Sequence, residues 1–363
     1  MKLFNFDHAL TSPMDFKIGP FEISITKEHC SNLKLLPQRT SYQYEHDATF
    51  SRHVKKIPQN RGEFVPTAIA TWSTQENIPP SVLFPSIPGP DAVYDLVILL
   101  SFLTGRRVYL EDELDWDPRR AYGERILGGQ ELVGFANHAW AKLPELAAGG
   151  LSDALSCLVQ AAHSPDLIGW GAYASAALDS IVTSWASANG KTKFQDDTLI
   201  KTARKTIEAT LLDGGVSPES AKDIVARLNN IGSPSAITKI KWFLQEFDLF
   251  SKTPTEDEMN RLRRLNLVRN AIAHSGTVRI EPTLGPEISL SVAGAVIGLS
   301  HEIAELHLAR RILGIEAAST KNSTETIKRF FSEGTFRGQK VFEEKFEEYL
   351  SRLEKTWLDG GIF

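Results

Sequence analysis

Residues 262–276, LRRLNLVRNAIAHSG, combine the pattern of a buried helix with three polar residues in its last turns. The apolar positions recur at steps of three or four residues, which predicts one buried helical face: Leu262, Leu265, Val268 and Ile272. Arg269, Asn270 and His274 lie close to the point where we expect the helix to stop, at Gly276. Polar side chains beside an apolar face need a partner or a ligand, so this stretch is the first candidate for function.

Helical periodicity continues on both sides of this stretch, from about residue 127 onward. Before it, several segments carry apolar residues at helical spacing and end at turn-forming residues: 131–150, 151–164, 165–190, 198–215, 217–232 and 233–248. After it, we expect an extended hairpin or loop at 277–292, a long helix at 292–317, and one or two charged amphipathic helices at 322–358. The larger part of the chain is therefore predicted to be helical.

The N-terminal part has a different pattern. Up to about residue 90, short apolar clusters alternate with turn formers, and FEISITKE (21–28) and FVPTAIATWS (64–73) have the alternation or the β-branched residues of strands. A continuous apolar run at 91–105 predicts a buried helix capped by Gly105. We therefore expect an α+β fold with a β-rich N-terminal domain at 1–125, a helical domain at 126–318 and a C-terminal helical extension at 319–363.

The composition is typical of a globular protein in a reducing compartment. The chain has 363 residues, 42% of them hydrophobic, and a formal net charge of -5, which excludes binding to nucleic acid through bulk positive charge. Cys30 and Cys157 are far apart and lack the spacing of metal ligands, which favours reduced thiols. The N-terminus lacks the apolar run of a signal peptide, and the most apolar stretches, 92–105 and 290–314, are too short or too charged to span a membrane. We expect a cytoplasmic protein without membrane contact.

Common catalytic and metal-binding signatures are missing from the sequence. It contains no phosphate-binding glycine loop followed by Lys-Ser/Thr, no G-x-S-x-G elbow and no C-x-x-C pair. HEIAELH (301–307) falls short of a zinc helix, because Glu305 stands where the second histidine is needed, and we interpret His301 and Glu305 as a polar pair. The acidic stretch 111–117 is interpreted as a solvated turn and not as a cation site. No metal and no cofactor is assigned.

RNAIAH (269–274) resembles the Arg-x(4–6)-His signature of HEPN domains. YASAALDSIVTSW (173–185) resembles an early helix of that family with an inward acidic residue, here Asp179, and ITKIKWFLQEF (237–247) precedes the signature as in the Apea-like HEPN branch. The likeness covers roughly residues 150–318. It implies an all-α HEPN bundle, often preceded by a β-rich domain, in a metal-independent endoribonuclease that cleaves RNA as a homodimer. Many members are toxins or antiviral (abortive infection) proteins, so the N-terminal domain is expected to receive a trigger or regulatory partner.

The chemistry of these residue types agrees with that implication. RNA carries its own nucleophile, the 2′-hydroxyl, so cleavage needs a proton acceptor and donor, for which His274 is suited at neutral pH, and positive charge at the phosphate, for which Arg269 is suited. Asn270 would orient the phosphate or the imidazole, and Asp179 is a supporting residue. A basic rim is expected to bind the RNA strand: Arg261, Arg263, Arg264, Arg279, Lys239 and Lys241.

The geometry of a helix leaves an alternative open. On an ideal helix Arg269 and His274 are rotated by about 140° from each other, so both reach one ligand only if the helix end unwinds or a second copy of the helix faces the first across a two-fold axis. In the alternative, Arg269 pairs with an acidic neighbour such as Asp179, and His274 caps its own helix. The chain would then be a non-catalytic HEPN module for dimerisation or for binding RNA or a nucleotide.

Overall fold

The computed structural model describes residues 1–37, 40–46, 52–58, 62–72, 77–111, 125–193, 197–227, 232–275 and 286–341. Packing divides the chain into two compact units, Met1–Ile181 with Pro254–Phe363 (unit 1) and Val182–Thr253 (unit 2). The domain boundaries expected after residues 125 and 318 both fall inside unit 1 and stay a prediction.

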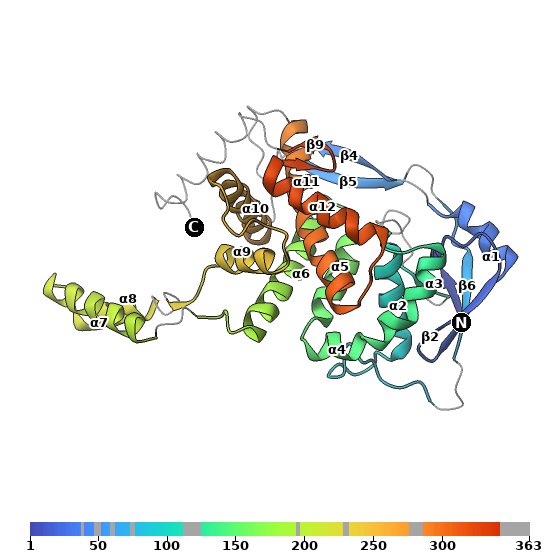
Figure 1. The fold of residues 1–363 in the computed structure, drawn as a ribbon, viewed down its shortest axis with the longest axis horizontal. Coiled ribbons are helices and arrows are strands. Elements are labelled where there is room, and N and C mark those ends of the chain that lie inside the picture. The colour runs from blue at the N-terminus through green and yellow to red at the C-terminus, as the bar shows by residue number, and fades with distance from the viewer. Residues whose placement is uncertain are drawn as a thin grey trace. The chain divides into compact units, whose positions relative to one another are not determined.

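Unit 1 begins with a five-stranded antiparallel sheet in the order β2-β3-β6-β1-β7. Two of its strands, β2 and β6, are labelled in Figure 1. Its strands are β1 (Lys2–Phe4), β2 (Met14–Ile18), β3 (Phe21–Ile25), β6 (Pro66–Trp72) and β7 (Tyr109–Leu110). β3 alternates as its sequence predicts, because Phe21, Ile23 and Ile25 are buried whereas Glu22 is exposed. A separate hairpin pairs β4 (Thr40–His46) with β5 (Arg52–Pro58).

Three short or buried helices accompany the sheet in the chain: α1 (Lys27–Asn32), the 3-10 helix η1 (Leu33–Leu35) and α2 (Ala92–Thr104). Asp91 caps the N-terminus of α2 by accepting hydrogen bonds from the N–H groups of Val93 and Tyr94. Gly105 ends the helix in the left-handed conformation, at φ 61°, which glycine adopts without strain. The helix expected at 91–105 and its glycine cap are both confirmed.

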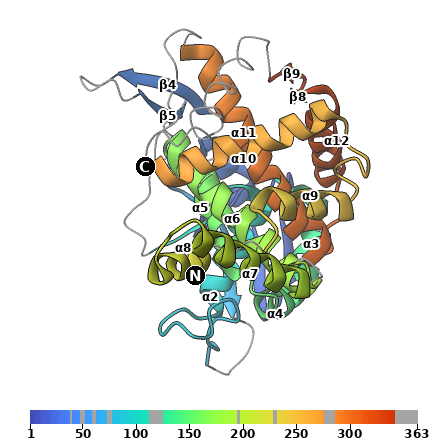
Figure 2. The same ribbon diagram turned by 90° about the vertical axis from the view of Figure 1, so that its left-hand side faces the viewer.

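The rest of unit 1 is mainly helical, with α3 (Gly129–Ala141), α4 (Leu143–Ala148), α5 (Ser152–Ala162), most of α6 (Leu167–Ala188), α10 (Glu256–Ser275), α11 (Pro286–Leu306), the π-helix η5 (His307–Ile312) and α12 (Ala318–Glu333). α10 packs against α11 and α12, as Figure 1 and Figure 2 show. An apolar cluster joins α5, α6 and α11, and Trp170 and Val268 pack against it: Ala161, Leu167, Ala174, Ala293 and Ile297. The sheet and the helices that follow confirm the α+β fold class.

Unit 2 contains the last turns of α6 and the helices α7 (Asp197–Asp213), α8 (Pro218–Arg227) and α9 (Ala236–Glu246). α7 and α8 pack against each other. Trp185 and Phe243 meet edge to face, with 5.6 Å between ring centroids. Ser217 precedes α8, where its Oγ accepts from the N–H of Ser220, and Ser235 caps α9 in the same way. Helices are therefore present within the segments expected at 217–232 and 233–248, and the second begins at Ala236, three residues into its segment.

The start of α11 differs from the expectation. α11 begins at Pro286, so residues 286–291 are helical where a hairpin or loop is expected, and residues 277–285 lie outside the described residues. Proline suits the first turn of a helix, because its missing N–H would have no partner there. Pro286 is therefore the first residue of a helix and not part of a turn.

Glycines end the last two helices that the structure describes. The helix expected at 292–317 passes into η5 and stops before Gly314, which has φ 68°. Of the one or two helices expected at 322–358, α12 begins earlier, at Ala318, and ends before Gly334, which has φ 70°. A hairpin of β8 (Thr335–Phe336) and β9 (Gln339–Lys340) follows, and residues 342–358 lie outside the described residues. Both glycines are in the left-handed region that ends helices. Among the described helices, none has the length and apolar character needed to cross a membrane.

Candidate functional site

α10 carries the three residues with predicted catalytic roles: Arg269, Asn270 and His274. The helix starts with a capping box, in which Thr255 Oγ1 accepts from the N–H of Glu258 at 3.2 Å and Glu258 Oε2 accepts from the N–H of Thr255 at 2.7 Å. Leu262 and Leu265 are fully buried, and Val268 packs on the apolar cluster of unit 1. The first three residues of the expected apolar face of α10 are thus anchored in the core, and the Ile272 side chain lies outside what the structure describes.

Arg269 on α10 forms an ion pair with Asp179 on α6, with 2.5 Å between Nη1 and Oδ1. The pair is unequal, because the Arg269 side chain is 5% exposed whereas that of Asp179 is 52% exposed. A guanidinium removed from water depends on its anionic partner, and this partner faces solvent on its other side. The structure therefore brings together two of the predicted residues, in the pairing that the non-catalytic alternative also requires.

A polar stripe runs along α10 close to this pair. Asn266 and Asn270 are four residues apart on one side of the helix, and both are half-buried. Asn266 Oδ1 is buried and accepts no hydrogen bond from the described residues. His274 continues the same spacing on the backbone of α10, which is helical to Ser275, but the His274 side chain lies outside what the structure describes. A buried oxygen without a donor marks this stripe as a place where water or a ligand would bind.

Arg261, at the start of the expected basic rim, caps the end of α12. Its Nη1 donates to the main-chain oxygens of Phe331 at 2.6 Å and Ser332 at 2.9 Å. Carbonyls in the last turn of a helix have no partner within the helix, so the guanidinium supplies the missing donors. Its Nε also lies 3.2 Å from where a β-carbon would stand at Gly334. Arg261 is thus engaged in closing α12.

The other basic residues of the expected rim do not share one environment. Arg263 is exposed and Arg264 is buried, although they are neighbours on α10. Lys239 and Lys241 are half-buried on α9 in unit 2. Arg279 lies outside the described residues. Among those that the structure describes, Arg263 presents the most accessible charge on α10.

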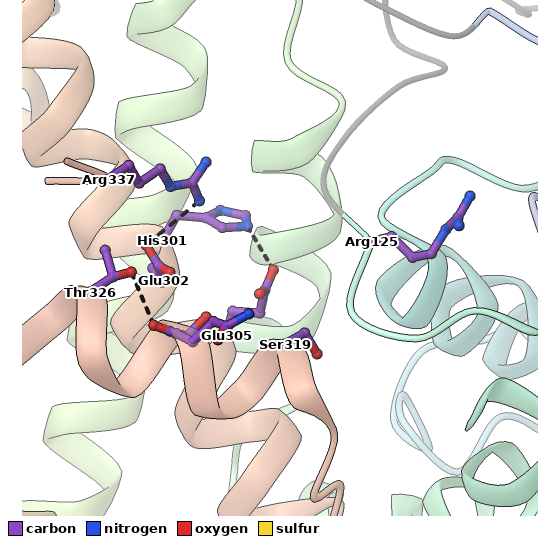
Figure 3. Close-up of a pocket in the computed structure, with 9 residues that line it drawn as sticks. Arg125, His301, Glu302, Glu305, Ser319, Thr326 and Arg337 are labelled. Atoms are coloured by element: carbon purple, nitrogen blue, oxygen red, sulfur yellow. Dashed lines mark hydrogen bonds and ion pairs between the residues drawn. The ribbon is translucent and has the colours of Figure 1, made fainter. Parts of the chain in front are cut away.

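A polar cavity of about 250 Å³ opens elsewhere in unit 1 (Figure 3). It is lined by α11, by α12 and by two arginines that precede α3 and follow α12: His301, Glu302, Glu305, Ser319, Asn322, Ser323, Thr326, Arg125 and Arg337. His301 Nε2 lies 3.3 Å from Glu305 Oε2, which confirms the polar pair expected on this helix. Arg337 Nη2 lies 3.6 Å from Glu302 Oε2. The cavity is therefore built from charged groups of both signs.

α11 links this cavity to α10. Ala293 and Ile297, in the middle of α11, belong to the cluster against which Val268 of α10 packs. The next turns of α11 carry the cavity residues. Trp170 of α6 packs on the same cluster, and its ring centroid lies 6.2 Å from that of His301, edge to face. The polar cavity and the helix with the predicted catalytic residues are thus fixed to one common helix.

Most of the cavity has no signal in the sequence. The spacing of His301 and Glu305 is visible as an i, i+4 pair. Arg125 and Arg337, however, are separated by more than half of the chain, and only the fold brings both to this cavity. Asn266 could have been found, because it stands four residues before Asn270. Within the described ranges, no group of three or more His, Cys, Asp or Glu residues is arranged to hold a metal ion.

No protein-family model, curated protein or solved structure matches this chain. The likeness to HEPN domains therefore depends on the residues of the sequence itself, and both the family and its activity are taken up as a proposal.

Proposed function

We propose that this chain is a HEPN-type endoribonuclease that cleaves RNA without a metal ion. The proposal depends most on the ion pair of Arg269 and Asp179, which holds the arginine of the signature between α10 and α6. Asn270 follows it directly, and the backbone of α10 carries His274 onward along the same helix. The residues of the signature are thus attached to a rigid element, as a catalytic group needs.

In the proposed reaction the 2′-oxygen of RNA attacks the adjacent phosphorus, and the bond from that phosphorus to the 5′-oxygen breaks. One His274 imidazole accepts the proton of the 2′-hydroxyl, and a protonated His274 of a second copy gives a proton to the departing 5′-oxygen. Arg269 donates hydrogen bonds to the phosphoryl oxygens while negative charge develops on them. The products are a 2′,3′-cyclic phosphate and a 5′-hydroxyl.

The geometry of α10 sets two conditions for this reaction. Arg269 is almost fully buried, so phosphate oxygens would reach its guanidinium from the half-exposed side of Asp179. Arg269 and His274 are about 140° apart around an ideal helix, so one copy does not direct both at the same phosphate. A second copy across a two-fold axis would supply the missing group, and the proposed enzyme is accordingly a homodimer.

The test is cleavage of RNA by purified protein in the presence of EDTA. Wild-type protein is expected to produce fragments with a cyclic phosphate end, and His274→Ala is expected to lower the rate by about 100-fold or more. Arg269→Lys keeps the charge but loses the forked donor set, so a comparable loss is expected. Lys142→Ala, which removes an exposed charge near α4, serves as the matched control and is expected to cleave as the wild type does. Cleavage by folded His274→Ala at the wild-type rate would remove His274 from the reaction.

A second function is favoured by the burial of Arg269. A guanidinium that is 5% exposed and already paired resembles a structural anchor, as expected for a non-catalytic module for dimerisation or for binding RNA or a nucleotide. In that case RNA is retained in an electrophoretic shift experiment without any product. Arg269→Ala and His274→Ala then both lower the melting temperature, and neither changes the absence of cleavage.

We place the enzyme in the cytoplasm, as a toxin or an antiviral protein of the abortive-infection kind. Residues 1–125 would receive the trigger or regulatory partner, because they precede the helices that carry the signature. Induced expression of the wild type, with its trigger present, is expected to stop growth and degrade cellular RNA. Equal growth of cells that express the wild type or His274→Ala would contradict this role.

A further inference from the structure

The polar cavity on α11 and α12 is lined by buried acidic residues and by more exposed arginines. Glu302 is 8% exposed, and Glu305 and His301 are also mostly buried. Arg337, in contrast, is 46% exposed. Arg125 is 41% exposed and forms an ion pair with Asp7, a carboxylate that Arg106 also contacts, so two arginines share one negative charge there. The cavity therefore has an acidic inner part and a cationic mouth.

Two of the hydroxyl groups that line the cavity already donate their hydrogens to the main chain. Ser319 Oγ donates to the carbonyl of Ile126 at 2.7 Å, and Thr326 Oγ1 donates to that of Asn322 at 3.0 Å. What these oxygens still offer is the capacity to accept, which is also what an ionised carboxylate offers. These two oxygens and the carboxylates therefore favour an occupant that donates hydrogen bonds.

His301 adds another acceptor to this wall. Its Nε2 lies 3.3 Å from Glu305 Oε2, and because a carboxylate only accepts, Nε2 carries the hydrogen. In the neutral ring Nδ1 is then an acceptor, and this atom is buried without a hydrogen-bond partner among the described residues. A buried acceptor without a hydrogen bond destabilises the structure. The imidazole therefore favours an occupant that donates a hydrogen bond, as the carboxylates do.

Charge and size narrow the choice of donor. Glu302 and Glu305 carry two negative charges, and Arg337 offsets them from 3.6 Å, so the inner part favours a cation. A bare metal ion is disfavoured, since the described residues hold no cluster of three or more suitable ligands. The cavity volume of about 250 Å³ is large enough for a small organic amine.

The two arginines at the mouth determine which charge the outer end of the occupant can carry. Arg125 and Arg337 would repel a molecule with ammonium groups at both ends and attract one with an anionic end. We propose that this cavity binds a small zwitterion, a free amino acid or an aminoalkyl phosphate. Its ammonium group lies against Glu302 and Glu305, and its carboxylate or phosphate lies between the two arginines. The inference is independent of the proposed ribonuclease, because none of these residues belongs to the predicted site on α10.

The experiment uses the full chain and three probes of equal length that differ in their end groups: 4-aminobutyrate, 1,4-diaminobutane and succinate. The standard amino acids and phosphoethanolamine are added singly to cover both kinds of zwitterion. We expect at least one zwitterion to raise the melting temperature and to bind in calorimetry, and the diamine and the diacid to bind about tenfold more weakly or not at all. A diamine that binds as tightly as every zwitterion, or no binding by any zwitterion at about 10 mM, would overturn the proposal.

Two variants locate the binding. Glu305→Gln keeps the shape of the side chain and removes its charge, so zwitterion binding is expected to weaken by about tenfold or more. Ser323→Leu fills the cavity without altering an ion pair and is expected to abolish binding, which covers the case in which Glu305→Gln does not fold. Glu145→Gln, at an exposed glutamate of α4, is the control and should bind as the wild type. Unchanged binding in both cavity variants would place the ligand elsewhere and refute the assignment.

Discussion

Trp170 and His301 lie edge to face with 6.2 Å between their rings, and they connect the two candidate sites of unit 1. The indole packs on the apolar cluster that anchors Val268 of α10, whereas the imidazole lines the polar cavity. A change in the position of this indole would therefore alter both the packing beside α10 and the wall of the polar cavity.

Trp170→Ala is expected to lower the free energy of unfolding by about 2 to 4 kcal/mol, because it removes a large, partly buried ring and leaves space on the cluster. Trp170→Phe keeps an aromatic ring and should cost less than half as much. Urea unfolding of the three proteins gives the comparison. If the alanine variant is as stable as the wild type, Trp170 does not support the cluster.

Asp179→Ala is expected to destabilise the protein by about 1 to 3 kcal/mol, because it leaves the buried guanidinium of Arg269 without its anion. The loss stays below that of a fully buried pair, since Asp179 is itself half-exposed. The double change Asp179→Ala with Arg269→Met removes the unpaired charge and should recover part of the stability. A double-mutant cycle by urea unfolding measures this coupling, and strictly additive losses would show that the two side chains act separately.

Arg261→Ala is expected to lower the free energy of unfolding by about 1 to 2 kcal/mol, since the last carbonyls of α12 lose both of their donated hydrogen bonds. Arg263→Ala, two positions along the same helix, is the control and should change stability by less than about 0.5 kcal/mol, because the side chain is exposed. Thermal unfolding of both variants provides the measurement. Equal effects of the two substitutions would argue against the cap.

Stability is expected to fall as the pH is lowered from 6.5 to 4. Burial lowers the pKa of His8 from 6.5 to about 4, and burial together with the nearby charge of Arg311 does the same for His307. Both rings are neutral in the folded chain, so unfolding takes up protons in this window, and the contribution is complete above pH 6.5. Each shift corresponds to about 3 kcal/mol at the acidic end.

Urea unfolding between pH 6.5 and 4.5 measures this dependence. His307→Gln removes one of the two titrating groups, so its stability should depend less steeply on pH than that of the wild type. A stability that stays level across this range in the wild type would contradict the burial of two neutral histidines.

The elements that could be predicted are those whose signals are local. α2 combines a mainly apolar run with an aspartate before it and a glycine after it, and each of these signals acts within a few residues of the chain. The same holds for β3, where side chains alternate between the core and solvent. The apolar face of α10 was visible for this reason, and so was its polar stripe, of which Asn270 and His274 were recognised.

Features that depend on distant parts of the chain could not be predicted. The contact of Arg337 with Glu302 joins the hairpin β8–β9 to α11, and nothing near either residue indicates it. The hydrogen bonds from Arg261 on α10 to the end of α12 also join distant parts of the chain. They give a structural role to a residue that was expected in an RNA-binding rim. Charge alone does not distinguish an arginine that meets a phosphate from one that meets a carbonyl.

The π-helix η5 gives the end of α11 a property of its own. The N–H of Leu313 donates to the carbonyl of Leu308 at 2.9 Å, five residues back, so each turn holds more residues than an α-turn does. The side chains beyond this point are shifted by one position relative to the α-helical register of α11. With this shift, Leu313 and Ile315 are buried in the core. Loss of a single residue here, such as the exposed Arg311, would let the backbone close as an ordinary α-helix. Chain length can therefore vary by one at this place with less disturbance than anywhere in the regular part of the helix.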